Sequence, residues 1–375
     1  RDMHGVDWDA MLEKYLPLVD RLTCREDLID LQRQMAGELS ALHVYVWSPD
    51  LRRDEKDVHL ASLGAVLSRD EKAGGYRIET IYRADPDLPE GRSPLDRPGL
   101  DILEGDLVTA INGVSMLDVA HPGQLLRNQS DAQLRLETRR GKRGEPREFI
   151  VHPIPASRED ELRYEQWELE RRERVDAASD ERIGYVHLRA MGAGDYASWM
   201  RHYFPIFQRQ GLIIDLRHNG GGNIDSWILS RLLRKAWMYW SPRVGDSYWN
   251  MHYAFRGHMV VLVDEWTASD GEAFADGFRR LGLGEVIGTR SWGGEIWLTS
   301  SNSLVDRGIV TAPEFGVYGP EGEWLIEGRG VEPDIVVDNL PHATFMGGDA
   351  QLDAALAHLL AKIAEDPRPM PEAPP

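Results

Sequence analysis

The sequence contains a single cysteine, Cys24, among its 375 residues. One cysteine excludes a disulfide within the chain and favours a reducing, cytoplasmic location. The sequence has no run of about 20 apolar residues, so a membrane-spanning helix is not expected. Positive charge is also scarce, because 43 Lys and Arg face 62 Asp and Glu and the net charge is −19. Nucleic acids and anionic membranes repel an acidic protein, so neither is expected as a partner.

The chain starts at Arg1 and shows neither an initiator methionine nor a signal peptide. We therefore expect the sequence to be a fragment or a shortened form, and further domains could precede it. Its length is sufficient for two or three domains, since single cores rarely grow beyond roughly 250–300 residues.

Changes in the periodicity of apolar residues predict the domain organisation. Helical spacing in the first part and alternation of period two in the second predict a helical block followed by a small antiparallel β-domain. A charged helical linker comes next, then strands alternate with helices, as in an α/β domain with a mostly parallel sheet. A Pro-rich, disordered tail ends the chain. The predicted boundaries are 1–58, 59–155, 156–182, 183–364 and 365–375.

Three consecutive glycines, Gly220, Gly221 and Gly222, follow the apolar strand "LIIDLR" and precede a predicted helix. Their unobstructed N–H groups, beside the positive end of that helix, could bind an anion or an oxyanion. The loop lacks the Lys-Ser/Thr pair of a nucleotide-binding P-loop, which makes phosphate the weaker alternative. A purely structural glycine turn is the other interpretation.

Ser269 lies in "WTASDGEAF", where the strand "MVVLVDE" gives way to a helix. Taken alone, the serine is more typical of a helix N-cap, with Glu272 completing a capping box. The order strand, glycine loop, helix, strand, serine, helix favours a nucleophile instead. It would bring Ser269 and the glycine loop to neighbouring strand ends, where α/β sheets bind their ligands.

Four segments, "LIIDLRHNGGGN", "VVLVDEWTASDGEAFA", "VIGTRSWGGE" and "EGRGVEPDIVV", together resemble the motif series of the tail-specific serine peptidases. The form "ASDGE" is similar to tricorn-type members of that family, and residues 93–116 resemble a PDZ domain. The resemblance implies a multidomain α/β protein with a helical N-terminal block, a PDZ β-barrel and a crotonase-like α/β sandwich. It also implies cleavage of peptides or unfolded proteins without metal or cofactor, and a homo-oligomer, hexameric in the tricorn type.

The general base is the least determined part of this prediction. No lysine occurs between Ser269 and Lys362, which excludes the downstream lysine base common among tail-specific peptidases, unless an earlier lysine reaches across. The resemblance implies His43 as the base and Glu327 as the residue that orients it. The family usually has a hydroxyl residue before this histidine, whereas the sequence here has Leu42. Ser40 or a water could supply the missing hydrogen bond, or the relay could be simplified.

The oxyanion would be bound by the N–H of Asp270 and one N–H of the glycine turn, with Gly221 as the central choice among Gly220–Gly222. Two groups of residues are expected to line the substrate pocket and make it apolar. They are Trp237, Tyr239 and Trp240 after the glycine-turn helix, and Trp292 and Gly293 in "SWGGE".

Two other functions remain open at this point. A catalytically silent scaffold could use the PDZ domain and the cleft to bind peptides, with Leu42 as the sign of a broken relay. A crotonase-like enzyme acting on thioesters would also use glycine-rich oxyanion turns, although the PDZ-like region and the "ASDGE" serine argue against it.

Overall fold

The structure is a computed structural model that describes residues 5–47, 58–141, 144–298, 307–311 and 313–374. The chain forms two compact units, of which the first combines residues 1–52 with 174–375 and the second contains residues 53–173. Helix α3 (Ala156–Ser179) carries the chain from the second unit back into the first.

A five-stranded parallel sheet forms the centre of the first unit, with the strand order β10-β11-β14-β15-β19. The strands are β10 (Ile183–His187), β11 (Gly211–Asp215), β14 (His258–Val263), β15 (Gly284–Gly288) and β19 (Ile335–Val336). β10 and β11 are buried along their whole length. Continuous burial is expected of a parallel sheet that is covered on both faces.

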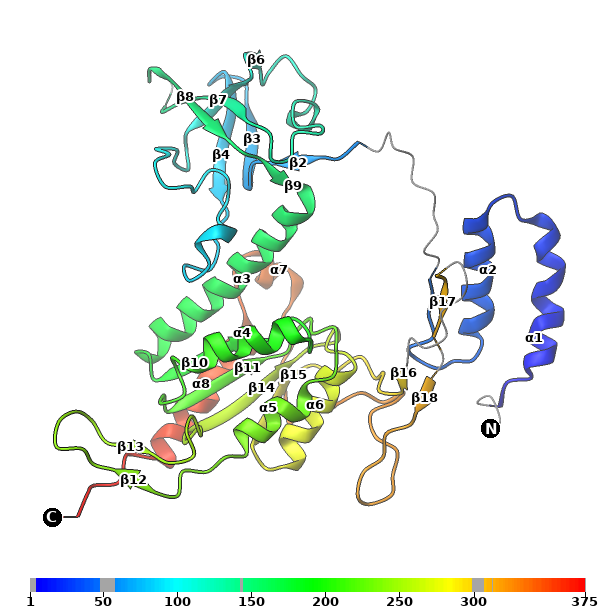
Figure 1. The fold of residues 1–375 in the computed structure, drawn as a ribbon, viewed down its shortest axis with the longest axis vertical. Helices are drawn as coiled ribbons and strands as arrows, with labels where there is room; N and C mark the ends of the chain where they lie inside the picture. The colour runs from blue at the N-terminus through cyan, green and yellow to red at the C-terminus, as the bar shows by residue number, and fades with distance from the viewer. Residues whose placement is uncertain (1–4, 48–57, 142–143, 299–306, 312, 375) are drawn as a thin grey trace. The chain divides into compact units, whose positions relative to one another are not determined.

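Helices cover both faces of this sheet (Figure 1). Alternate strand residues point to opposite faces, so Ile214 and Val261 belong to one core, and Ile213 and Val260 to the other. The first core includes residues of α4, α5 and α6, and the second includes residues of α8. The helices are α4 (Ala193–Tyr203), α5 (Asp225–Leu232), α6 (Asp270–Arg280), α7 (Pro341–Phe345) and α8 (Ala350–Glu365).

β11 and β14 are neighbours in register, with Asp215 opposite Leu262. Both strands run in the same direction, so the loops that follow them emerge at the same edge of the sheet. These two loops contain the glycine turn and Ser269. The sheet therefore brings together the two segments that the sequence singles out.

The first unit also contains short two-stranded ladders, and one of them pairs the N-terminal segment with residues 309–310. β1 (Val46–Trp47) pairs antiparallel with β17 (Ile309–Val310). The remaining short elements of this unit are α1 (Trp8–Tyr15), η2 (Leu16–Arg21), α2 (Arg25–Gly37), β12 (Tyr239–Trp240), β13 (Tyr248–Trp249), β16 (Trp297–Leu298) and β18 (Pro313–Phe315).

The second unit is an antiparallel sheet in the order β3-β4-β5-β7-β8, packed around buried residues such as Ile78, Ile111 and Leu134. Asp106, directly before the central strand of this sheet, is buried and accepts hydrogen bonds from Arg140 and Arg147. The strands of the second unit are β2 (Ala61–Ser62), β3 (Ala65–Asp70), β4 (Gly75–Ile81), β5 (Leu107–Ile111), β6 (Val114–Ser115), β7 (Leu134–Arg139), β8 (Pro146–Val151) and β9 (Ile154–Pro155). The unit also contains the 3-10 turns η3 (Pro89–Gly91) and η4 (Pro122–Gln124).

Within the residues that the structure describes, no helix has the length and apolar character needed to cross a membrane.

Candidate active site

Ser269 occupies a strained turn between β14 and α6. Its backbone has φ +55° and ψ −125°, a conformation that a residue with a Cβ rarely adopts. Strain of this kind concentrates at functional sites, and a sharp strand-to-helix turn presents the nucleophile in other serine hydrolases. Ser269 makes no side-chain capping hydrogen bond, since the N–H of Glu272 donates to its main-chain carbonyl at 2.7 Å. The hydroxyl is thus not used as a helix cap.

The glycine turn packs directly against this serine. Gly221 has φ +84°, and a Cβ on it would lie 2.6 Å from Ser269 Cβ and 3.2 Å from Ser269 Oγ. Only glycine fits so close to the nucleophile in this backbone conformation. The N–H of Ala268 donates to the Asn219 carbonyl at 2.9 Å and joins the two loops.

The N–H groups around the serine differ in their partners. That of Gly220 donates to the Arg189 carbonyl at 3.1 Å, and that of Gly221 donates to Asn219 Oδ1 at 2.9 Å. Over the described part of the chain, the N–H groups of Gly222 and Asp270 make no hydrogen bond. These two N–H groups are therefore available to a ligand.

The carboxylate of Asp270 joins the two helices that begin at this edge of the sheet. Its Oδ2 accepts hydrogen bonds from the N–H of Ile224 at 2.7 Å and of Asp225 at 3.1 Å, at the start of α5. Burial, together with the nearby charge of Asp225, raises the pKa of Asp270 to about 7. Sequence reasoning assigned only the N–H of Asp270 a role, because the partner loop lies 45 residues upstream.

Glu272, in the first turn of α6, is fully buried. Its carboxylate accepts four hydrogen bonds, one from the N–H of Ser269 and three from the loop after β15. Burial raises the pKa of Glu272, and the hydrogen bonds from Ser291, Gly294, Gly293 and Ser269 oppose that rise. The hydrogen bond from the N–H of Ser269 to Glu272, which a capping box predicts, is present. The three hydrogen bonds from the loop after β15 were not predicted from the sequence.

His43 lies next to the β1–β17 ladder, which joins the N-terminal segment to residues 309–310. Thr311 Oγ1, next to β17, donates to the His43 carbonyl at 2.8 Å, and the N–H of Tyr45 donates to Thr311 Oγ1 at 2.7 Å. The His43 side chain is buried, and its ring meets the Trp292 ring edge to face, with centroids 5.4 Å apart. The N-terminal segment thus places its histidine against the loop that Glu272 holds.

Glu327 binds the second half of this loop. Its Oε2 accepts hydrogen bonds from the N–H of Glu295 at 2.8 Å and of Ile296 at 2.9 Å. Its Oε1 accepts from the N–H of Leu42 at 3.3 Å. The main chain of Leu42, rather than a side-chain hydroxyl, therefore connects Glu327 with the residue before His43.

The electrostatic surroundings of His43 favour a neutral ring. Burial lowers the pKa of His43, while the charge of Glu327 and the carbonyl of Ile296 oppose this shift. His43 Nδ1 is buried and has no hydrogen-bond partner among the described residues. A neutral, buried imidazole can accept a proton at neutral pH, as a general base must.

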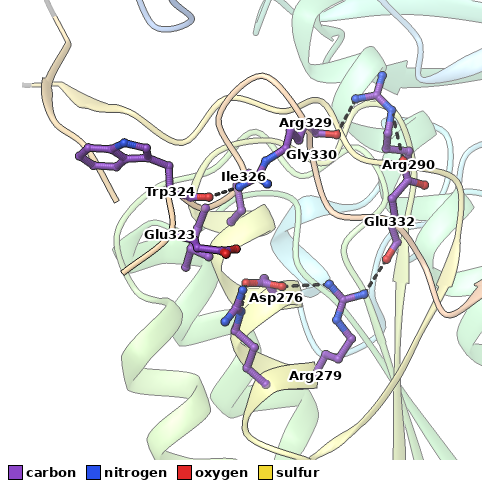
Figure 2. A pocket seen from close by; sticks show the side chains of 11 residues that line it. Asp276, Arg279, Arg290, Glu323, Trp324, Ile326, Arg329, Gly330 and Glu332 are labelled. Carbon is purple, nitrogen blue, oxygen red and sulfur yellow. Dashed lines mark hydrogen bonds and ion pairs between the residues drawn. The ribbon is translucent and has the colours of Figure 1, made fainter. Parts of the chain in front are cut away.

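A pocket of about 590 Å³ lies beside the segment that carries Glu327. Figure 2 shows Arg279 of α6 between Asp276 and the main chain of Glu332, to which it donates hydrogen bonds at 2.9 Å and 2.7 Å. Arg290 donates to the Arg329 carbonyl at 2.8 Å. The lining of this pocket contains none of the three predicted catalytic residues. We therefore interpret the arginines of the pocket as residues that connect α6 with the segment around Glu327.

A buried ion network stabilises the strand end before the glycine turn. The Arg217 side chain donates to Asp215 at 2.6 Å and to Asp349, at the start of α8, at 2.7 Å. Burial alone would raise the pKa of Asp215, but the charge and hydrogen bonds of Arg217 hold it well below its ordinary value. Asp215 is therefore ionised throughout the physiological pH range.

The predicted pocket residues fall into two groups. Trp292 is 37% exposed beside His43, and the N–H of Gly293 donates to Glu272 Oε1 at 2.6 Å. Trp237 is 68% exposed, and Tyr239 and Trp240 form β12, which pairs with β13. The structure places Trp292 and Gly293 next to the catalytic candidates, and the place of the β12 residues in a pocket stays a prediction.

Comparison with protein families assigns each part of the chain. Residues 182–337 match peptidase family S41, residues 61–156 match the tricorn protease PDZ domain, and residues 1–37 match the tricorn protease C1 domain. The chain carries a peptidase family S41 domain. The predictions of a tail-specific, tricorn-like peptidase domain and of a PDZ domain are thereby confirmed.

The chain is similar to known proteins over nearly its whole length. The chain is 34% identical over 370 residues to tricorn protease homolog 1 of Streptomyces coelicolor and 29% identical over 368 residues to tricorn protease of Thermoplasma acidophilum. It is also similar to the crystal structure of tricorn protease, with a TM-score of 0.87 and 28% identity over 95% of this chain. These matches cover 99%, 98% and 95% of this chain but only 34% of each relative. The chain thus spans about a third of the length of these relatives.

Proposed function

We propose that the chain is a serine peptidase that cleaves peptides or unfolded proteins through an acyl-enzyme intermediate. One observation carries the proposal. The strained Ser269 turn packs against the Gly221 turn, and the loop after β15 bonded to that serine turn also contacts His43 and Glu327. Residues from three distant parts of the sequence converge there, as acyl transfer by a serine requires.

The roles follow from the chemistry of each group. Ser269 Oγ attacks the peptide carbonyl, and His43 takes the hydroxyl proton and then delivers it to the leaving amine. Glu327 keeps the segment of His43 in place and stabilises the imidazolium that forms. The contact through Leu42 N–H supports this role, and the effect of the Glu327 charge on His43 supports it as well.

We assign the oxyanion site to the N–H groups of Gly222 and Asp270. Among the glycines of the turn, Gly222 is the better donor because the N–H groups of Gly220 and Gly221 already have partners. Loss of one such donor in other serine peptidases costs on the order of 3 kcal/mol of transition-state stabilisation.

The wider organisation extends this proposal. We propose a crotonase-like sandwich for the peptidase domain and a helical block, with α1 and α2, that presents the base. From the sequence resemblance we also propose a homo-oligomer located in the cytoplasm. An apolar substrate pocket is supported by aromatic residues such as Trp292, whose ring packs on His43.

The test is covalent labelling of the folded chain by a fluorophosphonate, which reacts with activated serines, together with cleavage of a fluorogenic peptide library. We expect labelling at Ser269, loss of both signals in Ser269→Ala, and no loss in Ser226→Ala, which removes an exposed hydroxyl on α5. A folded wild type that is neither labelled nor active would support the silent peptide-binding scaffold. Binding of an acyl-CoA in place of peptides would support the thioester enzyme.

A further inference from the structure

Two carboxylates hold the same loop from opposite ends. We call residues 291–296, with the sequence SWGGEI, the bridging loop. Glu272 binds its first half through Ser291, Gly293 and Gly294, and Glu327 binds its second half through Glu295 and Ile296. Glu327 already has a role in the proposed mechanism, whereas Glu272 has none.

The hydrogen bonds of Glu272 are complete and short. Oε1 accepts from Ser291 Oγ at 2.5 Å and from the N–H of Gly293 at 2.6 Å, and Oε2 accepts from the N–H groups of Gly294 and Ser269, each at 2.9 Å. The side chain is fully buried, so water cannot replace these bonds. Hydrogen bonds to a buried charge are strong, and their loss leaves four donors unsatisfied.

The bridging loop also sets the surroundings of His43. Trp292 lies between Ser291 and Gly293, the two residues bonded to Glu272 Oε1, and its N–H donates to the Thr267 carbonyl at 3.0 Å. Its indole ring meets the His43 ring at an interplanar angle of 88°. A displacement of this loop would therefore change the packing on the imidazole.

We propose that Glu272 is a positioning residue for the general base: it holds the Ser269 turn and the bridging loop together, and through Trp292 it keeps the His43 ring buried against that loop. The inference rests on the proposed peptidase function and extends it by one residue. Glu272 acts on His43 only through the loop, so its effect is visible in the imidazole as well as in the reaction.

The groups that face His43 define the expected response. They are the Glu327 carboxylate, the Ile296 carbonyl, the Tyr45 ring and the Trp292 ring. Burial lowers the pKa of His43, and the first two groups oppose that shift. If the bridging loop loosens, the imidazole is better hydrated while Glu327 remains, and the pKa of His43 rises toward its ordinary value near 6.5.

The experiment is an NMR titration of 13C-labelled histidine, with the His43 signal assigned by its loss in His43→Asn. The variants are Glu272→Gln, Trp292→Ala and their combination. Glu265→Gln is the matched control, because it removes the same charge from an exposed side chain before the Ser269 turn. We expect the pKa of His43 to rise in Glu272→Gln and Trp292→Ala. We expect no further rise in the double variant, since both changes act through one contact.

Fluorophosphonate labelling of the same variants supplies the second readout. We expect the rate of labelling of Glu272→Gln at neutral pH to fall by on the order of 10- to 100-fold, as for other misplacements of about 1 Å. The acid limb of its pH profile should move up with the pKa of His43. Glu265→Gln should match the wild type in both respects.

An unchanged pKa of His43 in folded Glu272→Gln overturns the inference, even if labelling slows, because Glu272 would then act on Ser269 alone. If Glu272→Gln does not fold, Glu272→Asp retains the charge on a shorter side chain and is expected to shift the pKa of His43 in the same direction. An unlabelled wild type whose His43 still responds to Glu272→Gln would refute the peptidase function and leave the positioning role intact.

Discussion

The two halves of the candidate site are built in different ways. The glycine turn follows β11, Ser269 follows β14, and Glu272 lies in the first turn of α6. The buried carboxylate of Glu272 accepts four hydrogen bonds, three of them from the loop after β15. The base half joins Leu42 and His43 to a glutamate 285 residues further along the chain, and His43 Nδ1 has no partner in the described residues. The nucleophile half is thus held by many hydrogen bonds between neighbouring loops, whereas the base half depends on a few long-range contacts.

The largest expected effect tests whether the base half is needed for chemistry. We predict that His43→Ala slows acylation by on the order of 10⁴-fold, because removal of a triad base leaves only binding and the oxyanion site. Pre-steady-state labelling measures this step. His59→Ala, outside the peptidase domain, is the control, and a His43→Ala variant with wild-type rates would mean that another group activates Ser269.

The next effect concerns the stability of the nucleophile half. Arg217→Met leaves Asp215 and Asp349 buried without their cation, and we predict a loss of about 3–5 kcal/mol in the free energy of unfolding. Urea unfolding measures this loss, with Arg243→Met as the exposed control. Equal stability of the two variants would show that the network contributes nothing to the end of β11.

A smaller effect depends on pH and concerns Glu295, in the bridging loop. Burial, and then the charges of Glu272, Asp270 and Asp225, raise the pKa of Glu295 from 4.5 to about 9, although the hydrogen bond from Trp297 opposes the rise. Above pH 4.5 the unfolded chain releases the proton of Glu295, whereas the folded chain retains it. The contribution of protonated Glu295 to the free energy of unfolding is therefore complete below pH 4.5 and is lost as the pH rises towards 9.

Glu295→Gln removes this titration. Relative to the wild type, we predict that the variant gains on the order of 1–3 kcal/mol of unfolding free energy between pH 5 and pH 8. Urea unfolding at both pH values measures the change. A constant difference between the two proteins would mean that Glu295 is ionised in the folded chain.

The smallest effect would complete the base half. Leu42→Ser adds a hydroxyl to the residue before His43, whose Nδ1 has no hydrogen-bond partner among the described residues. If the new hydroxyl bonds to Nδ1, acylation should accelerate by less than about tenfold. Leu42→Ala, which shortens the side chain without adding a hydroxyl, separates the hydrogen bond from the change in volume. Slower acylation by Leu42→Ser than by Leu42→Ala would contradict this account of Nδ1.

These differences explain what the sequence could predict. The α/β domain and the small antiparallel β-domain follow from local periodicity, and the assignment of the latter as a PDZ domain follows from the resemblance of residues 93–116. The pairing of the glycine turn with Ser269 follows from motifs that adjacent strands bring together. The hydrogen-bond donors to Glu272 on the bridging loop and the carboxylate contacts of Asp270 could not be predicted. Hydrogen bonds between loops that are distant in the sequence do not show in the spacing of residues. His43 was selected by family resemblance alone, since no local pattern distinguishes it from eleven other histidines. The catalytic roles themselves stay predictions.

The β1–β17 ladder has a consequence for the timing of activity. Among the described residues it contains two residue pairs, Val46 with Val310 and Trp47 with Ile309, and 268 positions separate His43 from Thr311. A ribosome makes His43 long before the strand that receives it, and the nucleophile emerges in between. In the proposed mechanism, Ser269 thus stays without its base until β17 has been synthesised. The nascent chain therefore cannot cleave peptides before that point.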